Sequence, residues 1–285
     1  MPITITPNKN DFGATITDID LSKTPKPEEF LKIKNAWLEY QVLSFPNQKL
    51  SLVDLERFSE CFGDYGDDPY VAPISDHQHI IEVRREPDEK PPPFGSSWHS
   101  DWSFQKTPPA ATILLGKIIP RSGGDTQFAN GFKAFESLDK KLQVEITNLT
   151  AIHSARRPYS REGYEASGGQ QRSMKILPSN SAYAEQEHPV VRTHPESGRQ
   201  ALWINPVYTV GLKGLSKTES KSILDNLFNH YLQDKFIYNH KWKANMLIMW
   251  DNRSVMHRAM GGYDGQLRVM HRTTIAGDKP FYSSA

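Results

Sequence analysis

The sequence lacks three features that would point to particular classes of protein. Its 285 residues include a single cysteine, Cys61, so no disulfide can form within the chain and a cysteine-rich zinc site is excluded. Lysine and arginine number 34 against 33 acidic residues, and a net charge of +1 gives no reason to expect nucleic acid or an acidic membrane surface as a partner. The longest apolar runs, such as residues 246–250, are far too short to span a bilayer.

The start of the sequence also lacks the pattern of a secretion signal. Residues 1–6 (MPITIT) have neither a basic beginning nor an apolar core. Hydrophobic residues make up 37% of the chain and aromatic residues 11%, which is enough for a packed core. We therefore expect a soluble, cytoplasmic, globular protein with no nucleic-acid or membrane partner.

Short apolar and alternating runs predict many strands and few helices. Phe30, Ile33 and Trp37 stand at helical spacing and predict a helix over residues 25–40. Capping boxes at residues 51–54 and 216–219 begin two more helices, and another helical stretch is expected at 132–148. The expected strands are 2–6, 14–19, 42–45, 79–84, 111–119, 126–129, 190–193, 201–204, 236–242, 246–250, 255–260 and 268–275.

This pattern favours a mainly β chain with helical decoration (α+β), built as an antiparallel jelly-roll sandwich. No internal repeat or low-complexity linker divides the sequence, so we expect one domain over residues 1–285. Residues 156–186 are polar and have no clear period. A segment of that length inside a compact domain is typical of a lid or a mobile insert.

A histidine and an aspartate stand two residues apart in the stretch 97–102 (SWHSDW). In an extended segment, alternate side chains point to the same side, so His99 and Asp101 would converge. An imidazole and a carboxylate can hold two positions on a divalent metal, and His257 is a candidate for the third. Two histidines and one carboxylate form the facial triad of non-haem Fe(II) oxygenases, which leaves coordination positions open for chemistry.

Other histidine pairs compete with this interpretation, because the chain has ten histidines and some suggestive spacings arise by chance. His77 and His79 also stand two residues apart, but no acid-bearing motif accompanies them. His188, His194 and His271 stand beside predicted strands, where structural histidines are common. The spacing alone therefore leaves the metal site open.

Five sequence fragments occur together in one order: WHSD at 98–101, SGGDT at 122–126, WDNR at 250–253, His257, and RVMHR at 268–272. Together they resemble the TauD/TfdA family of Fe(II)- and 2-oxoglutarate-dependent dioxygenases, and the resemblance covers most of the chain. It implies a double-stranded β-helix core, which is a jelly-roll, cupin-like fold.

The resemblance also implies roles for individual residues. His99, Asp101 and His257 would hold Fe(II), and 2-oxoglutarate and O₂ would take the remaining positions. Arg268 and Thr126 would bind the far carboxylate of 2-oxoglutarate. A planar guanidinium fork matches a carboxylate better than an ammonium does.

Arg272 lies four residues beyond Arg268, so in a strand both side chains face the same way. In family members similar to taurine dioxygenase, this second arginine meets the anionic group of the prime substrate. A salt bridge with a nearby acid is the alternative. Trp102 and Tyr70 are expected as further walls of the substrate pocket, although aromatic residues are more often part of a core.

Two positions depart from the taurine enzymes. Those enzymes have a histidine where this chain has Asp68, and an asparagine where it has Gly95. Asp68 would repel a sulfonate if it reached the pocket, which counts against taurine. Such an acid would instead favour a cationic group on the substrate, although exposed loop acids are common.

These features predict a dioxygenase that oxidises a C–H bond of a small organic anion and releases succinate and CO₂. The anion would be a sulfonate, a sulfate ester or a carboxylate such as an aryloxyalkanoate. One alternative is hydroxylation or desaturation of an amino acid or specialised metabolite at the same iron site. Another is a non-catalytic, ligand-binding jelly roll. The resemblance also suggests a homodimer or homotetramer.

Overall fold

The computed structural model describes residues 2–284, within which the strands form one seven-stranded sheet and three smaller sheets. Neighbouring strands of the large sheet are antiparallel, apart from the parallel pair β2–β3. The large sheet has the order β1 (Thr4–Pro7), β2 (Ala14–Thr17), β3 (Val42–Phe45), β13 (Leu247–Asp251), β5 (Ala111–Ile118), β15 (Arg268–Ile275) and β4 (Ile81–Arg85).

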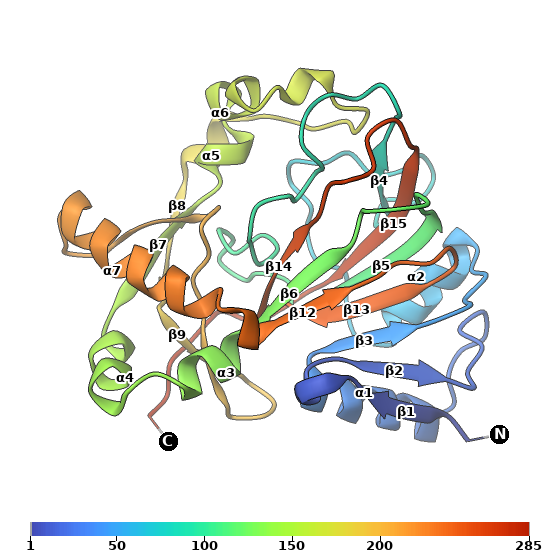
Figure 1. Ribbon diagram of the computed structural model, residues 1–285, viewed down its shortest axis with the longest axis horizontal. Coiled ribbons are helices and arrows are strands. Elements are labelled where there is room, and N and C mark those ends of the chain that lie inside the picture. The colour runs from blue at the N-terminus through green and yellow to red at the C-terminus, as the bar shows by residue number, and fades with distance from the viewer. Residues whose placement is uncertain (1, 285) are drawn as a thin grey trace.

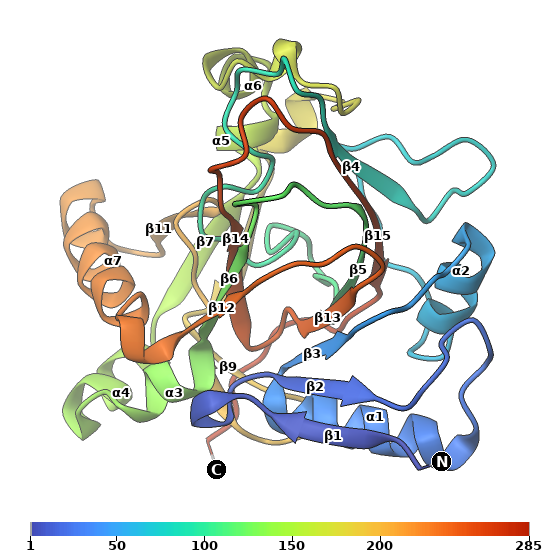
Figure 2. The ribbon, with the colours of Figure 1, turned by 45° about the vertical axis from the view of Figure 1, so that its right-hand side comes forward.

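A three-stranded sheet lies across from the large one, with β6 and β14 opposite β5 and β15 (Figure 2). It has the order β12 (Ile237–His240), β6 (Thr126–Asn130) and β14 (Val255–Ala259). The other two sheets are β11 (Thr209–Leu212), β7 (Thr150–Ser154) and β8 (Glu185–Pro189), and the pair β10 (Gln200–Leu202) and β9 (Val191–Thr193).

The helices cover the outside of this strand assembly (Figure 1). Along α1 (Pro27–Tyr40), Ile33 and Trp37 face the core beneath the large sheet, as their spacing predicted. Ser51 caps α2 (Leu52–Glu60), and Ser216 caps α7 (Lys217–Tyr231). The remaining helices are α3 (Gly131–Glu136), α4 (Lys140–Thr147), α5 (Arg156–Tyr159) and α6 (Arg161–Ala166).

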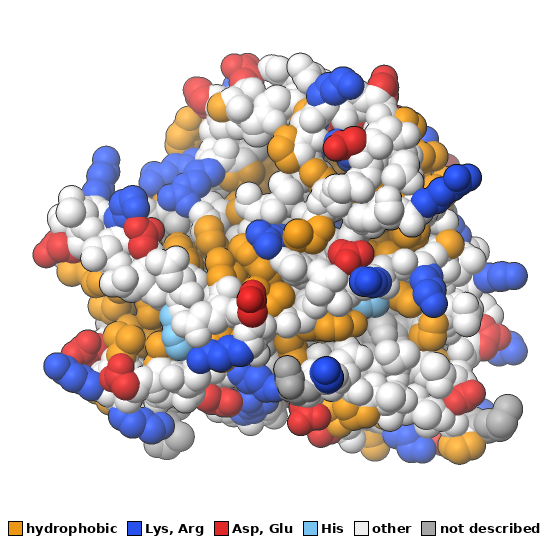
Figure 3. Space-filling view, viewed as in Figure 1, with side chains coloured by type: hydrophobic (Ala, Val, Ile, Leu, Met, Phe, Trp, Pro, Cys, Tyr) orange, Lys and Arg blue, Asp and Glu red, His pale blue; other side chains and the backbone are white. Residues whose placement is uncertain are grey.

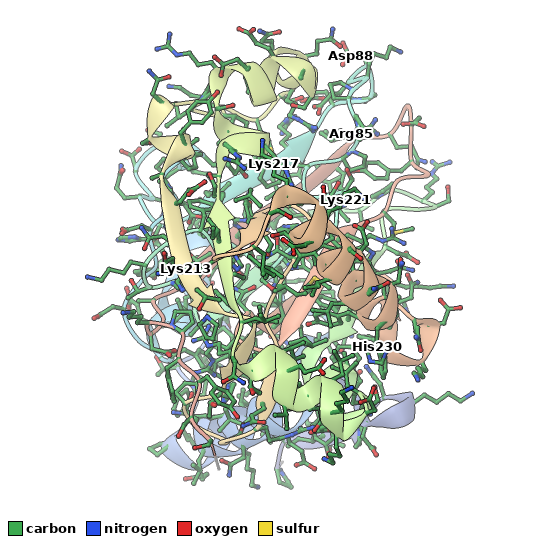
Figure 4. All side chains as sticks on the ribbon, turned by 90° about the vertical axis from the view of Figure 1, so that its left-hand side faces the viewer. Arg85, Asp88, Lys213, Lys217, Lys221 and His230 are labelled. Carbon is green, nitrogen blue, oxygen red and sulfur yellow. The ribbon has the colours of Figure 1, made fainter. Side chains whose placement is uncertain are left out.

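The surface matches the balanced composition of the chain. Lys217 and Lys221 lie on the exposed face of α7 (Figure 4), while Leu224 and Leu227 are buried on its other face. Basic and acidic side chains are interspersed over the face in Figure 3. Within residues 2–284, no helix has the length and apolar character needed to cross a membrane.

The predicted strands and helices are present with small shifts at their ends, but three strands and several short helices were not predicted. The missed strands are β7, β8 and β11. Residues 156–186, which show no clear period in the sequence, contain α5, α6 and two short 3-10 helices. The Ser160 hydroxyl caps α6 by accepting from the Gly163 amide. Helices of this length are too short to show a periodic pattern.

Candidate active site

His99 and His257 lie side by side because their backbones pair directly. The amide of each donates to the carbonyl of the other, at 3.0 and 2.8 Å. Their ring centroids are 4.2 Å apart. His257 also belongs to β14, which is held in register by β6. Strand pairing therefore fixes the spacing of the two imidazoles.

Asp101 joins the two histidines, but not through the extended geometry that the sequence suggested. The chain turns at Asp101, and Trp102 has a φ of +47°. Asp101 Oδ1 nevertheless lies 3.5 Å from His99 Nε2 and 3.9 Å from His257 Nε2. One potential ligand atom from each residue lies within 4.8 Å of the others, and all three residues are buried. The structure thus brings the three predicted metal ligands together.

The hydrogen bond of His99 and the pKa shifts of His257 and Asp101 suit a cation. His99 Nδ1 lies 2.7 Å from the Ser97 carbonyl, which accepts its proton and leaves Nε2 free to act as a ligand. Burial, together with the neighbouring His99, lowers the pKa of His257 to about 3. Burial alone would raise the pKa of Asp101, but His257, Arg272 and His99 hold it far below its usual range. Neutral imidazoles and an ionised carboxylate are the forms that bind metal.

A chain of hydrogen bonds behind Asp101 sets the direction of its carboxylate. Thr112 donates to Asp101 Oδ2 at 2.6 Å, which leaves Oδ1 directed at the histidines. Asn252 donates to Thr112 at 2.8 Å, and the Trp250 indole donates to Asn252 at 2.9 Å. Such supporting bonds orient metal ligands. Sequence reasoning missed both Thr112 and Asn252, although Asn252 stands inside the fragment 250–253.

A small cavity of about 40 Å³ is lined by the two histidines and by the predicted cosubstrate residues Thr126 and Arg268. Arg268 is 4% exposed, and its Nη2 donates to the Gly124 carbonyl at 3.4 Å. Its Nε has no partner, no acid among the described residues pairs with it, and burial lowers its pKa. A buried guanidinium without a counter-charge favours an anionic ligand.

The Trp242 indole orients the hydroxyl of Thr126. Its Nε1 donates to Thr126 Oγ1 at 2.9 Å, so the hydroxyl accepts that bond and keeps its own proton free to donate. Trp242 was not among the predicted site residues. It follows β12, and nothing in its sequence position indicated where its N–H group points.

Arg272 is on the same strand as Arg268 but has acidic partners. Its Nη2 donates to Asp68, and its Nη1 lies 3.5 Å from Asp101 Oδ1. The Trp102 indole and the Thr274 hydroxyl also donate to Asp68. The guanidinium lies over the Trp102 ring, 5.0 Å from its centroid. The alternative that the sequence left open for Arg272, a salt bridge with a nearby acid, is therefore present.

Comparisons with known proteins agree with this geometry. The family model described as "Taurine catabolism dioxygenase TauD, TfdA family" matches residues 4–274. The chain belongs to this family. As a family member it is an Fe(II)- and 2-oxoglutarate-dependent dioxygenase, as the five fragments predicted.

Relatives in the family cover most of the chain. An alkylsulfatase from Acinetobacter baylyi is 33% identical over 268 residues, or 94% of this chain and 83% of the relative. The alpha-ketoglutarate-dependent 2,4-dichlorophenoxyacetate dioxygenase from Cupriavidus pinatubonensis is 30% identical over 292 residues, or 94% of this chain and 95% of the relative. The crystal structure of AAD-2 in complex with Mn(II) and N-oxalylglycine matches with a TM-score of 0.80 and 27% identity, covering 99% of this chain and 100% of that one.

A second, larger cavity of about 620 Å³ also opens onto the histidine–aspartate cluster. Its wall includes His99, Asp101, Trp102 and Arg272. The segment 156–186 contributes much of the remainder. The lining residues from that segment are Arg157, Pro158, Tyr159, Tyr164, Ala166, Ser167, Arg172 and Ile176.

Two residues expected at the substrate pocket do not reach this wall. Tyr70 lies behind Tyr159, with the two rings stacked at 4.9 Å. Asp68 contacts Arg272 and Trp102, which leave its side chain 12% exposed, and it does not line the cavity. Of the four predicted substrate-binding residues, the structure places Trp102 and Arg272 at the cavity.

Proposed function

We propose that His99, Asp101 and His257 hold Fe(II), and that Arg268 and Thr126 bind the far carboxylate of 2-oxoglutarate. The observation that carries this proposal is the buried Arg268 guanidinium, which lacks a counter-charge in a cavity that both histidines line. The structural match to AAD-2, which was solved in complex with Mn(II) and N-oxalylglycine, supports a metal and a small ligand in a protein of this fold.

When bound, Fe(II) and 2-oxoglutarate supply the oxidation of a C–H bond by O₂, with 2-oxoglutarate converted to succinate and CO₂. The protein orients these groups. Ser97 fixes the tautomer of His99, and Thr112 directs Asp101 Oδ1 toward the histidines. Trp242 leaves the Thr126 proton available to a carboxylate oxygen. In this arrangement no side chain is needed as a general base.

We further propose that the prime substrate is a small organic anion, namely a sulfate ester, a sulfonate or an aryloxyalkanoate. The names of the alkylsulfatase and of the 2,4-dichlorophenoxyacetate dioxygenase support this class. The larger cavity, with its many aromatic and apolar residues, would admit such a molecule. The departures at Asp68 and Gly95 count against taurine.

We also propose that the large sheet and the β12–β6–β14 sheet form a jelly-roll core within one domain, and that residues 156–186 act as a lid. Support for the lid comes from the number of cavity-lining residues in that segment, among them Tyr159 and Tyr164. The cytoplasmic location and a homodimeric or homotetrameric state stay predictions from the sequence.

Anaerobic absorption spectroscopy tests the metal and cosubstrate assignment. With Fe(II) and 2-oxoglutarate the protein should show a weak visible charge-transfer band, which Asp101→Ala should abolish. His77→Ala is the control, because His77 pairs with Glu56 and lies outside the cluster. Absence of the band, together with no succinate release on a panel of sulfonates, alkyl sulfates, aryloxyalkanoates and amino acids, would refute the proposal.

A further inference from the structure

Arg268 has a cationic neighbour on the adjacent strand. In the register of β4 and β15, Arg85 lies directly opposite Arg268 (Arg85 is labelled in Figure 4). Both side chains are buried. Like charges directly opposite each other on a sheet are destabilising, and buried charges are screened less than exposed ones. The fold therefore needs other groups that offset the repulsion between the two guanidinium groups.

Tyr263 and Asp264, which follow one another in the loop between β14 and β15, contact the two arginines in different ways. Asp264 Oδ1 accepts from Arg85 Nη2 at 3.0 Å. Both guanidinium groups lie over the Tyr263 ring, whose centroid is 5.0 Å from Arg85 Cζ and 5.9 Å from Arg268 Cζ. Arg85 thus has a carboxylate as a partner, whereas Arg268 has the ring and the Gly124 carbonyl.

The Tyr263 ring supports a cation without acting as its counter-ion. The negative face of an aromatic ring attracts a guanidinium group, and the attraction is stronger when both groups are removed from water. Tyr263 is buried, and burial raises the pKa of its phenol, although Arg268 and Arg85 oppose the rise. The side chain is therefore neutral. The charge of Arg268 stays available to an anion in the small cavity, which Arg268 lines and Tyr263 does not.

Close backbone approach holds the tyrosine loop (residues 260–267) against the turn that precedes β6. Gly123 in that turn has a φ of +72°, and a Cβ at this position would collide with the Gly262 carbonyl, so glycine is needed there. The neighbouring Gly124 carbonyl accepts from Arg268 Nη2 at 3.4 Å. One backbone contact therefore fixes the relative positions of the ring and the carbonyl that hold Arg268.

We propose that Tyr263 is a positioning residue for 2-oxoglutarate binding: the negative face of its ring holds the Arg268 guanidinium in the direction that receives the far carboxylate. This inference rests on the proposed function, which assigns Arg268 to that carboxylate. A guanidinium group that is already held in place loses less rotamer freedom when a ligand binds, so a preorganised Arg268 binds the carboxylate more tightly. Tyr263 acts through Arg268 and need not touch the cosubstrate.

Two 2-oxo acids isolate the contribution of the far carboxylate. 2-Oxopentanoate matches 2-oxoglutarate at its 2-oxo and C1 carboxylate groups but has a methyl group in place of the far carboxylate. Calorimetric titration of the anaerobic, Fe(II)-loaded protein measures the dissociation constant of each acid. The ratio of the 2-oxopentanoate constant to the 2-oxoglutarate constant reports the far carboxylate alone. A loss of metal affinity or of folded protein would change both constants and leave the ratio unchanged.

Substitutions at residue 263 test the ring. Tyr263→Leu should lower the ratio about fivefold by weakening 2-oxoglutarate alone, because the guanidinium loses a buried cation–π contact. Tyr263→Phe retains the ring and should keep the ratio of the unsubstituted protein. Phe58→Leu is the matched control, because it also replaces a buried ring with leucine, but in the core beneath the large sheet, where Phe58 packs against Phe45.

A fluorinated ring keeps the test decisive if Tyr263→Leu does not fold. A Tyr263→Phe variant with three fluorine atoms on the ring has nearly the shape of Tyr263→Phe but a much weaker negative face. It should lower the ratio about threefold relative to Tyr263→Phe. An unchanged ratio in this variant, or in Tyr263→Leu, would overturn the positioning role.

The unsubstituted protein separates this inference from the proposed function. If it binds the two acids equally, the assignment of Arg268 to the far carboxylate fails, and the role of Tyr263 fails with it. If it prefers 2-oxoglutarate and the preference survives the loss of the ring, only the role of Tyr263 is refuted.

Discussion

Arg268 and Arg272 stand four residues apart on β15 and are equally buried, each 4% exposed. Their surroundings differ. Arg272 is paired with Asp68 and lies near Asp101, whereas no described acid pairs with Arg268. Burial alone therefore does not show which arginine can take a ligand. Whether a carboxylate lies next to the guanidinium decides which arginine can bind a ligand.

The largest expected effect comes from removing the ion pair between Arg272 and Asp68. Arg272→Met removes the charge while keeping much of the side-chain volume, and it leaves Asp68 buried without its cation. We expect the free energy of unfolding of the metal-free protein to fall by about 3–5 kcal/mol. Urea denaturation measures this. Arg84→Met is the control, because Arg84 pairs with Glu86 at the surface, where an ion pair contributes roughly 0–1 kcal/mol.

The matched substitution at Arg268 should weaken ligand binding instead of lowering the stability of the fold. Arg268→Met should weaken 2-oxoglutarate binding on the order of 100-fold, or about 2.7 kcal/mol, because a buried carboxylate loses its cation. Calorimetric titration of the Fe(II)-loaded protein measures the affinity. Without ligand, the free energy of unfolding should stay the same or rise. A loss as large as that of Arg272→Met would show that the two arginines do not differ in this way.

A fall in pH tests the folding stability near Thr126, the other predicted cosubstrate residue, without a substitution at Thr126 or Arg268. His240 pairs with Thr126 in the β12–β6 register, and burial lowers the pKa of His240 to about 4. An unfolded histidine titrates near 6.5, so between pH 6.5 and 4 the unfolded chain binds the extra proton. Stability should therefore fall as the pH falls through this window, with a contribution from His240 of about 2 kcal/mol between pH 7 and 5. In urea denaturation series at both pH values, His240→Gln should show a smaller difference than the unsubstituted protein.

The smallest expected effect concerns single hydrogen bonds at the two ends. Trp242→Phe removes the donor to Thr126 and should weaken 2-oxoglutarate about fivefold, or about 1 kcal/mol. Trp102→Phe removes the corresponding donor to Asp68 at the Arg272 end and should leave 2-oxoglutarate affinity unchanged. Equal effects of the two substitutions on that affinity would contradict separate roles for the two ends.

The sequence predicted features whose signals are local. Ser51 and Ser216 begin helices through capping boxes contained in four residues, and β15 has the expected bounds. The pairing of Arg272 with Asp68 joins residues 204 apart, and no spacing rule carries that information.

The candidate metal-binding cluster was predicted by residue type and by family resemblance, although its expected geometry was wrong in part. Asp101 lies in a turn and not in an extended segment, yet it converges on the histidines. Strands β7, β8 and β11 were missed because their short segments show no clear alternation. Thr112 was missed because a threonine in a β-branched strand needs no special role.

The reciprocal backbone bonds between His99 and His257 tie the candidate metal site to the folding of the chain. Beside them, Ser100 donates to the Val255 carbonyl across 155 residues of sequence. Closing so long a loop is entropically unfavourable, and such long-range contacts form slowly. A bound metal ion stabilises only the conformation in which both segments have met. Recovery of metal binding during refolding would therefore report the meeting of these two segments, not the early formation of helices.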